Sequence, residues 1–148
     1  VPYQLGTGTE RVAIKFSARP CTAHTEVLPE EPDDNFLRTA MQRTLSEESA
    51  CMEFLVQPRT RSAMSVEDSR TEWLEEEAPF YKVATITIPQ QTFDTPEQNT
   101  FCEYLSFTPW HALPEHRPLG SVNRLRKVIY AHISRTRREA NSVSIQEP

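Results

Sequence analysis

Three short segments of the chain are rich in apolar or β-branched residues, which predicts β-strands over residues 10–19, 51–57 and 81–88. In the first segment every second position from residue 12 is apolar, and the four positions are Val12, Ile14, Phe16 and Ala18. This period of two is typical of a strand with one buried face. Pro58 and Pro89 end the other two segments, because proline cannot donate to a strand ladder.

The strand predicted over 81–88 differs from the first because both of its faces are apolar or β-branched. One face carries Val83, Thr85 and Thr87, and the other carries Ala84, Ile86 and Ile88. A strand of this kind fits between two covering layers. We therefore expect both of its faces to be covered.

Helical spacing occurs over residues 35–47, 95–105 and 121–140. The first helix has apolar residues at Phe36, Leu37, Ala40, Met41 and Leu45. The second begins at Asp94-Thr95-Pro96-Glu97, where Asp or Thr can cap and proline suits the first turn. The third follows Gly120 with Ser121 as the expected cap, and its apolar stripe consists of Val122, Leu125, Ile129 and Ile133.

The connections between these elements are polar. Residues 20–34 contain three prolines and several acids, which predicts an exposed connection. Residues 59–79 contain six acidic side chains with no spacing that singles out a pair. A solvated loop is therefore the expected structure there, rather than a metal or acid–base site.

Strands followed by helices indicate an α+β chain with an antiparallel sheet, and we treat residues 1–148 as a single unit. Three strands cannot close a barrel. If the sheet belongs to a barrel, its other strands must come from elsewhere.

Composition excludes some classes of protein. Hydrophobic residues make up 37% and charged residues 25% of the chain, and no apolar run is long enough for a membrane helix. No charged leader with an apolar stretch opens the sequence, so we expect an intracellular protein. Cys21, Cys51 and Cys102 have no metal-site spacing and are expected to be reduced, partly buried thiols.

The charge is distributed unevenly. Residues 121–148 carry a net charge of +4, whereas residues 1–120 carry −9. A basic helix can meet nucleic acid, the carboxylates of a cofactor or an acidic neighbour. Few aromatic residues lie between the basic ones and the remainder is acidic, so no nucleic-acid partner is expected.

The third predicted helix carries the residues of greatest chemical interest. Arg126 and Tyr130 are four positions apart, which places them on one helix face. A guanidinium beside a phenol favours the phenolate form. A phenolate can serve as the axial ligand of ferric haem.

Three blocks of sequence surround this pair in a fixed order. They are Phe-x-Pro-Trp-His at 107–111, His-Arg-Pro-Leu-Gly at 116–120 and Asn-Arg-x-Arg-x-x-x-Tyr at 123–130. Together they resemble the closing part of the small catalase-related proteins of the haem-catalase superfamily, which also contains the coral-type allene oxide synthases. The resemblance covers about residues 83–138.

The resemblance implies that the cofactor is haem b, with Tyr130 as the metal ligand and Arg126 donating to its oxygen. Both residues are then the catalytic residues of this chain. Asn123 and Arg124 match the approach to the haem edge, where a propionate contact is expected. His111 and His116 match structural positions. The resemblance further implies that the sheet is the second half of a catalase-like eight-stranded antiparallel barrel, followed by C-terminal helices.

The distal histidine of the family has no counterpart in this chain. We therefore expect a haem-dependent catalase or peroxidase-like enzyme that acts on hydrogen peroxide or an organic hydroperoxide. It would be active only with a second polypeptide that supplies the distal half, within an oligomer in the cytoplasm or, in a eukaryote, the peroxisome. The alternatives are a haem-binding scaffold without catalysis and a hydroperoxide lyase or allene oxide synthase-like enzyme.

Overall fold

A computed structural model of the chain describes residues 1–22 and 27–143. Four strands form one antiparallel sheet in the order β1 (Pro2–Leu5), β2 (Val12–Pro20), β3 (Ala50–Pro58) and β4 (Tyr81–Ile88). The described residues also form three α-helices, α1 (Phe36–Glu47), α2 (Pro96–Tyr104) and α3 (Gly120–Asn141). The predicted α+β class is confirmed. The sheet is open, with β1 and β4 at its edges.

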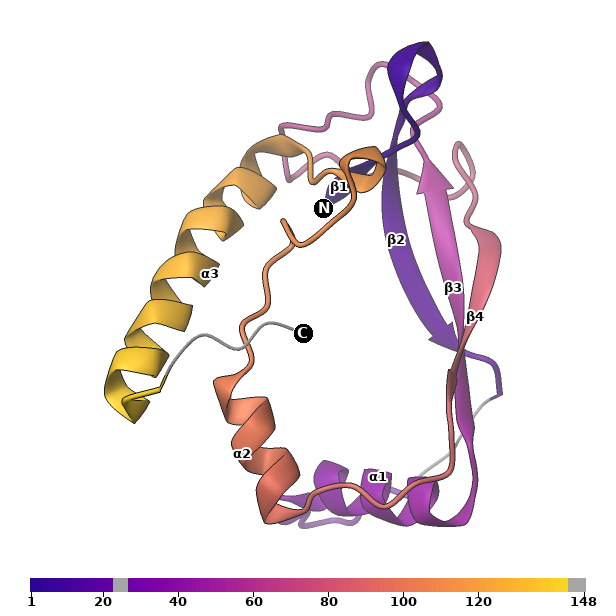
Figure 1. Cartoon of the computed structure of the whole chain (residues 1–148). Helices are drawn as coiled ribbons and strands as arrows, with labels where there is room; N and C mark the ends of the chain where they lie inside the picture. The colour runs from indigo at the N-terminus through magenta and orange to yellow at the C-terminus, as the bar shows by residue number, and fades with distance from the viewer. Residues whose placement is uncertain (23–26, 144–148) are drawn as a thin grey trace.

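The elements form a frame rather than stacked layers (Figure 1). The sheet lies on one side, α3 runs along the other, and α1 crosses between them at one end. Within the sheet each strand pairs along its length with the next, whereas α3 contacts it through β1. None of the helices in the described ranges is long and apolar enough to span a membrane.

The two faces of the sheet differ sharply in chemistry. Directly opposed residues share a face, so the pairings of Phe54 with Ala18 and Ala84 and of Met52 with Ile86 define an apolar face. The opposite face is polar: Glu53 accepts from Arg19 at 2.7 Å and pairs with Lys82 at 3.1 Å. Hydrogen bonds from these two cations lower the pKa of the Glu53 carboxyl.

Strand β4 is exposed on both faces, against the expectation that both would be covered. Seven of its eight residues are exposed, and Tyr81, Val83 and Ile86 are 56%, 57% and 43% exposed. Within the described sheet it pairs only with β3, and α1 approaches only its end, where Met41 and Leu45 line a depression with Thr87 and Ile88. Its apolar pattern on both faces is typical of a strand with both faces covered, whereas its exposed residues leave both faces open.

Residues 59–79 form an irregular segment whose acidic side chains are mostly exposed, as expected, but the segment also encloses a small core that was not expected. Met64, Trp73 and Ala78 are buried together, and their segment covers one end of the polar sheet face. Gln57 of β3 is 2% exposed, and its Nε2 donates to the carbonyl oxygens of Trp73 at 2.8 Å and Ala78 at 2.9 Å. The sequence did not predict this core, because its three apolar members are far apart and acidic residues lie between them.

Replacement of Gln57 by leucine tests this buried amide. Leucine fills similar space but leaves the carbonyl oxygens of Trp73 and Ala78 without a donor, so we expect a loss of about 2 kcal/mol in the free energy of unfolding. Urea denaturation followed by Trp fluorescence measures it. Gln90→Leu is the control, because the exposed Gln90 also donates to a carbonyl, Ser46 O at 2.8 Å. Equal losses in the two variants would contradict the assignment.

The predicted reduced thiols are wrong for two of the three cysteines. Cys21 and Cys51 form a disulfide with a Cα–Cα distance of 5.6 Å. Strand pairing brings them together, because Pro20 at the end of β2 is opposite Met52 of β3. Cys102 is free and exposed rather than partly buried. Part of the connection expected over 20–34, residues 23–26, lies outside the described residues.

The start of α2 follows its sequence signal. Thr95 is the N-cap: its hydroxyl accepts from Gln98 N at 3.2 Å, and Gln98 Oε1 accepts from Thr95 N at 3.1 Å. Asp94 instead adopts a left-handed backbone with φ 79° and accepts hydrogen bonds from Arg38 and Gln42 of α1. These contacts join α1 to the start of α2.

Candidate functional site

The segment just before α3 is attached to β1 by backbone hydrogen bonds. Leu119 N donates to Pro2 O at 3.0 Å, and Gln4 N donates to Arg117 O at 2.8 Å. The His-Arg-Pro-Leu-Gly block therefore runs beside β1, a strand that the sequence pattern did not reveal. Tyr3 is bridged to Pro118 between these two bonds.

Gly120 begins α3 at a point of close backbone approach. Its φ of +83° suits glycine, and a Cβ at this position would overlap the carbonyl oxygen of Val66. The N-cap residue is Leu119, which makes no side-chain cap bond, so the expected cap at Ser121 is wrong. The Ser121 hydroxyl donates to Glu67 O at 2.6 Å.

Asn123 is fully buried, and its side chain makes three hydrogen bonds. Its Nδ2 donates to Pro2 O at 2.8 Å and to Leu119 O at 3.0 Å, and its Oδ1 accepts from Arg126 Nη1 at 3.2 Å. Both ends of the amide are occupied and no surface is exposed. This arrangement disagrees with the cofactor contact expected for Asn123 and gives it the part of holding Arg126.

Arg126 and Tyr130 meet as their spacing predicts. Arg126 Nη2 donates to Tyr130 Oη at 3.1 Å, and Arg126 Cζ lies 5.1 Å from the centre of the Tyr130 ring. The hydrogen bond to Tyr130 raises the pKa of Arg126 above its ordinary value. The guanidinium therefore stays charged beside a phenol that is 36% exposed.

Tyr3 completes a group that sequence reasoning missed, which we call the α3 cluster: Tyr3, Asn123, Arg126 and Tyr130. Arg126 Nη1 donates to Tyr3 Oη at 3.4 Å. Nothing in the sequence around Tyr3 predicts its contact with Arg126, because this contact depends on the position of the four-residue strand β1. Tyr3 also packs against Phe16 at 5.1 Å between ring centres, and Phe16 stacks on Phe54 at 5.2 Å. A row of aromatic rings thus leads from the apolar sheet face to Arg126.

Arg124 lies outside the α3 cluster. Its Nη1 and Nη2 donate to the two carboxylate oxygens of Glu67 at 3.0 and 2.7 Å. The hydrogen bond from Arg124 lowers the pKa of Glu67 and in turn raises the pKa of Arg124. A propionate contact from Arg124 would require this exposed pair to open.

Tyr130 opens onto a depression of about 520 Å³ between α3 and the segment that follows α2. Trp110 forms part of its wall: its Nε1 donates to Asn123 O at 3.2 Å, and Lys127 Nζ lies 4.4 Å from its ring centre. His111 lines the same depression, whereas His116 has a buried Nδ1 without a hydrogen-bond partner. Trp110 therefore binds the backbone of Asn123, whose side chain binds β1.

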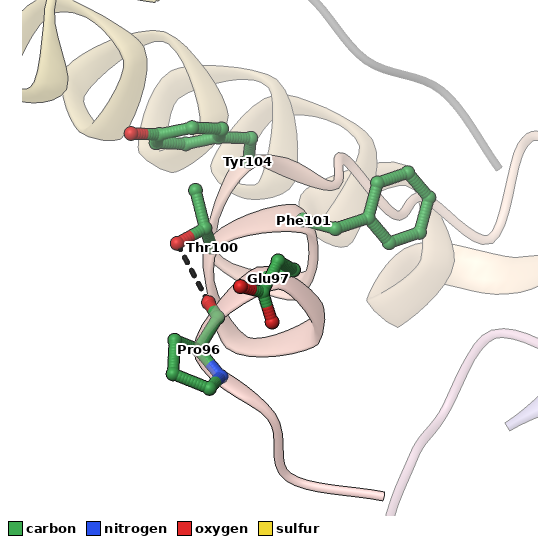
Figure 2. A pocket seen from close by; sticks show the side chains of 5 residues that line it. All are labelled: Pro96, Glu97, Thr100, Phe101 and Tyr104. Carbon is green, nitrogen blue, oxygen red and sulfur yellow. Dashed lines mark hydrogen bonds between the residues drawn. The ribbon is translucent and has the colours of Figure 1, made fainter.

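A second depression runs along α2 (Figure 2). It is lined by Pro96, Glu97, Thr100, Phe101 and Tyr104, and the Thr100 hydroxyl donates to Pro96 O at 2.8 Å. Glu97 is the one charged group in this lining, and hydrogen bonds at the helix start lower its pKa. One solvated carboxylate offers no acid–base pair, so the α3 cluster is the better candidate site.

Comparison with known proteins adds no assignment to this geometry. The sequence matches no protein-family model and no curated protein.

Proposed function

We propose that this chain is the haem-holding part of a haem-dependent oxidoreductase of the catalase-like family, acting on hydrogen peroxide or an organic hydroperoxide. The observation that carries the proposal is the 3.1 Å hydrogen bond from the charged Arg126 to the accessible oxygen of Tyr130. A charged donor at that distance stabilises the phenolate form of a tyrosine. Phenolate is the axial ligand that haem iron has in catalases.

The residues around Tyr130 fit haem in the chemistry of their side chains. Haem is a flat, mostly apolar ring that needs one axial ligand, an apolar surface and cations near its carboxylates. Tyr130 offers the ligand oxygen, and the aromatic row that ends at Tyr3 offers apolar surface beside the same guanidinium. The neighbouring Arg135 and Arg138 line the depression onto which Tyr130 opens and would suit carboxylates.

Bound haem would supply the iron at which the O–O bond of a peroxide is broken. Tyr130 would hold that iron through its oxygen, to which Arg126 donates a hydrogen bond. Asn123 orients Arg126 through its Oδ1, at 3.2 Å from Nη1.

We further propose that a second polypeptide completes the site and closes the sheet into a barrel. Strand β4 offers an unpaired edge, and the apolar stripe of α3 is uncovered, with Leu125, Ile129 and Ile133 at 60%, 42% and 51% exposed. Exposed apolar surface of this extent is typical of a protein–protein interface. The distal histidine would come from that partner.

The test is a titration of the full chain with haemin, followed by absorption spectroscopy. We expect the chain to take up haemin with a high-spin ferric spectrum, and Tyr130→Phe to lose this uptake because the ligand oxygen is gone. Tyr104→Phe on α2 is the matched control and should bind as the unchanged chain does. Haemin uptake by Tyr130→Phe with an unchanged spectrum would contradict the assignment of Tyr130.

Activity is assayed with and without any polypeptide that copurifies with the chain. Oxygen evolution from hydrogen peroxide only with the partner present supports the enzyme. Conversion of a fatty-acid hydroperoxide without oxygen evolution identifies the lyase or allene oxide synthase-like alternative. Haemin uptake with no turnover in either case identifies the scaffold.

A further inference from the structure

The Arg126 guanidinium has a second phenol within reach, on β1. We propose that Tyr3 is a positioning residue of the α3 cluster, whose hydroxyl fixes the Arg126 guanidinium so that Nη2 donates to the Tyr130 oxygen. The inference rests on the proposed function insofar as Tyr130 holds haem iron. Its structural content concerns Tyr3, Arg126 and Tyr130 alone.

The geometry of arginine explains how Tyr3 acts on Tyr130 without touching it. Arg126 Nη1 donates to Tyr3 Oη at 3.4 Å and to Asn123 Oδ1 at 3.2 Å, whereas Nη2 donates to Tyr130 Oη at 3.1 Å. The guanidinium is planar and its donors form a rigid fork. Two acceptors on Nη1 therefore fix the direction of Nη2.

Arg126 has another favourable position on Tyr130, above the ring. Its Cζ is already 5.1 Å from the ring centre, within the range of a cation–π contact. A guanidinium that moves further over the ring loses its donor direction toward the oxygen. The Tyr3 hydroxyl opposes this movement, because it binds the guanidinium on the side of β1.

Tyr3 is itself held firmly in place. Its strand is joined to the segment before α3 by hydrogen bonds at Pro2 O and Gln4 N, one on each side of Tyr3. Its ring packs against Phe16 at 5.1 Å. Tyr3→Phe keeps these contacts and removes only the hydroxyl.

The first arm of the test uses the chain without haem. Nitrogen-15 labelling of arginine allows NMR detection of the guanidinium protons, and Arg126→Lys identifies the Arg126 signals. We expect restricted rotation and slow solvent exchange of the Arg126 Nη protons in the unchanged chain. Exchange should be at least several-fold faster in Tyr3→Phe and unaltered in Tyr104→Phe. Backbone spectra of both variants check that the fold is kept. Unchanged Arg126 signals in a folded Tyr3→Phe would overturn the inference.

The second arm uses haemin. We expect Tyr3→Phe to bind haemin about tenfold more weakly, because a guanidinium that has lost the Tyr3 acceptor donates less well to the Tyr130 oxygen. Its ligand-to-iron charge-transfer band should also shift. If the unchanged chain takes up no haemin, the proposed function fails, while the first arm still tests Tyr3. If haemin binds through Tyr130 but Tyr3→Phe has the same affinity and spectrum, the role of Tyr3 fails and the proposed function stands.

Discussion

Gly120→Ala is expected to lower the free energy of unfolding by about 3 kcal/mol or more, through left-handed backbone strain and a steric overlap acting together. The φ of Gly120 is +83°, a conformation that a residue with a side chain rarely adopts. The added methyl group would also overlap Val66 O, a backbone atom of the small core segment. A backbone carbonyl cannot move aside as a flexible side chain can.

The position of Gly120 in the chain enlarges the effect. It is the first residue of α3, three residues before Asn123 and six before Arg126. A shift of the helix start would therefore disturb the hydrogen bonds between α3 and β1 as well. Urea denaturation followed by circular dichroism measures the loss. An unchanged slope of the free energy of unfolding against urea concentration shows that the variant and the unchanged chain unfold in the same transition.

Gly8→Ala provides the matched control. Gly8 also has a positive φ, +58°, but no atom lies within 4 Å of a Cβ added there. Only the strain of the left-handed backbone then applies, and we expect the free energy of unfolding to fall by about 1 kcal/mol. A Gly120→Ala variant no less stable than Gly8→Ala would show that the approach to Val66 O relaxes freely.

The hydrophobic pattern predicts the regular elements well because each has a local cause. The strand expected over 81–88 has those bounds, and the helix expected over 121–140 is observed as Gly120–Asn141. Proline after strands and the Thr95 capping box act through neighbouring residues, so they can be recognised in sequence.

The features that sequence reasoning missed depend on contacts between distant residues. Strand β1 has four residues and exists through its pairing with β2 and the segment before α3. The Cys21–Cys51 disulfide follows from strand register, which cysteine spacing does not encode. The exposure of β4 was missed for another reason: the sequence shows that both faces are apolar, but not whether another element packs against them.

The candidate site divides in the same way. Arg126 and Tyr130 are four residues apart on one helix, so their contact was predictable from spacing. The acceptors that hold Arg124 and Arg126 from outside the helix are Glu67 and Tyr3, which come from an irregular segment and from a strand that the pattern did not predict. The chemistry of the pair is local, whereas its orientation is a property of the fold.

Asn123→Leu is expected to lower the free energy of unfolding by about 3 kcal/mol, because it leaves buried polar groups without partners. Leucine has a similar volume, so packing changes little. Pro2 O and Leu119 O would lose a donor, and Arg126 Nη1 would lose its nearer acceptor. The Arg126 guanidinium is charged, and loss of a partner by a partly buried charge lowers stability more than loss of a partner by a neutral group.

Asn141→Leu makes the same substitution at the exposed end of α3 and should change stability by less than about 0.5 kcal/mol. The comparison isolates burial, since both residues belong to one helix. Asn123→Leu should further weaken haemin uptake under conditions in which the variant is still folded, because Arg126 Nη1 then relies on Tyr3 Oη at 3.4 Å. A variant that lost stability but bound haemin with unchanged affinity would separate the two parts given to Asn123. In that case Asn123 would only connect β1 to α3 through its bond to Pro2 O, and Tyr3 alone would orient Arg126.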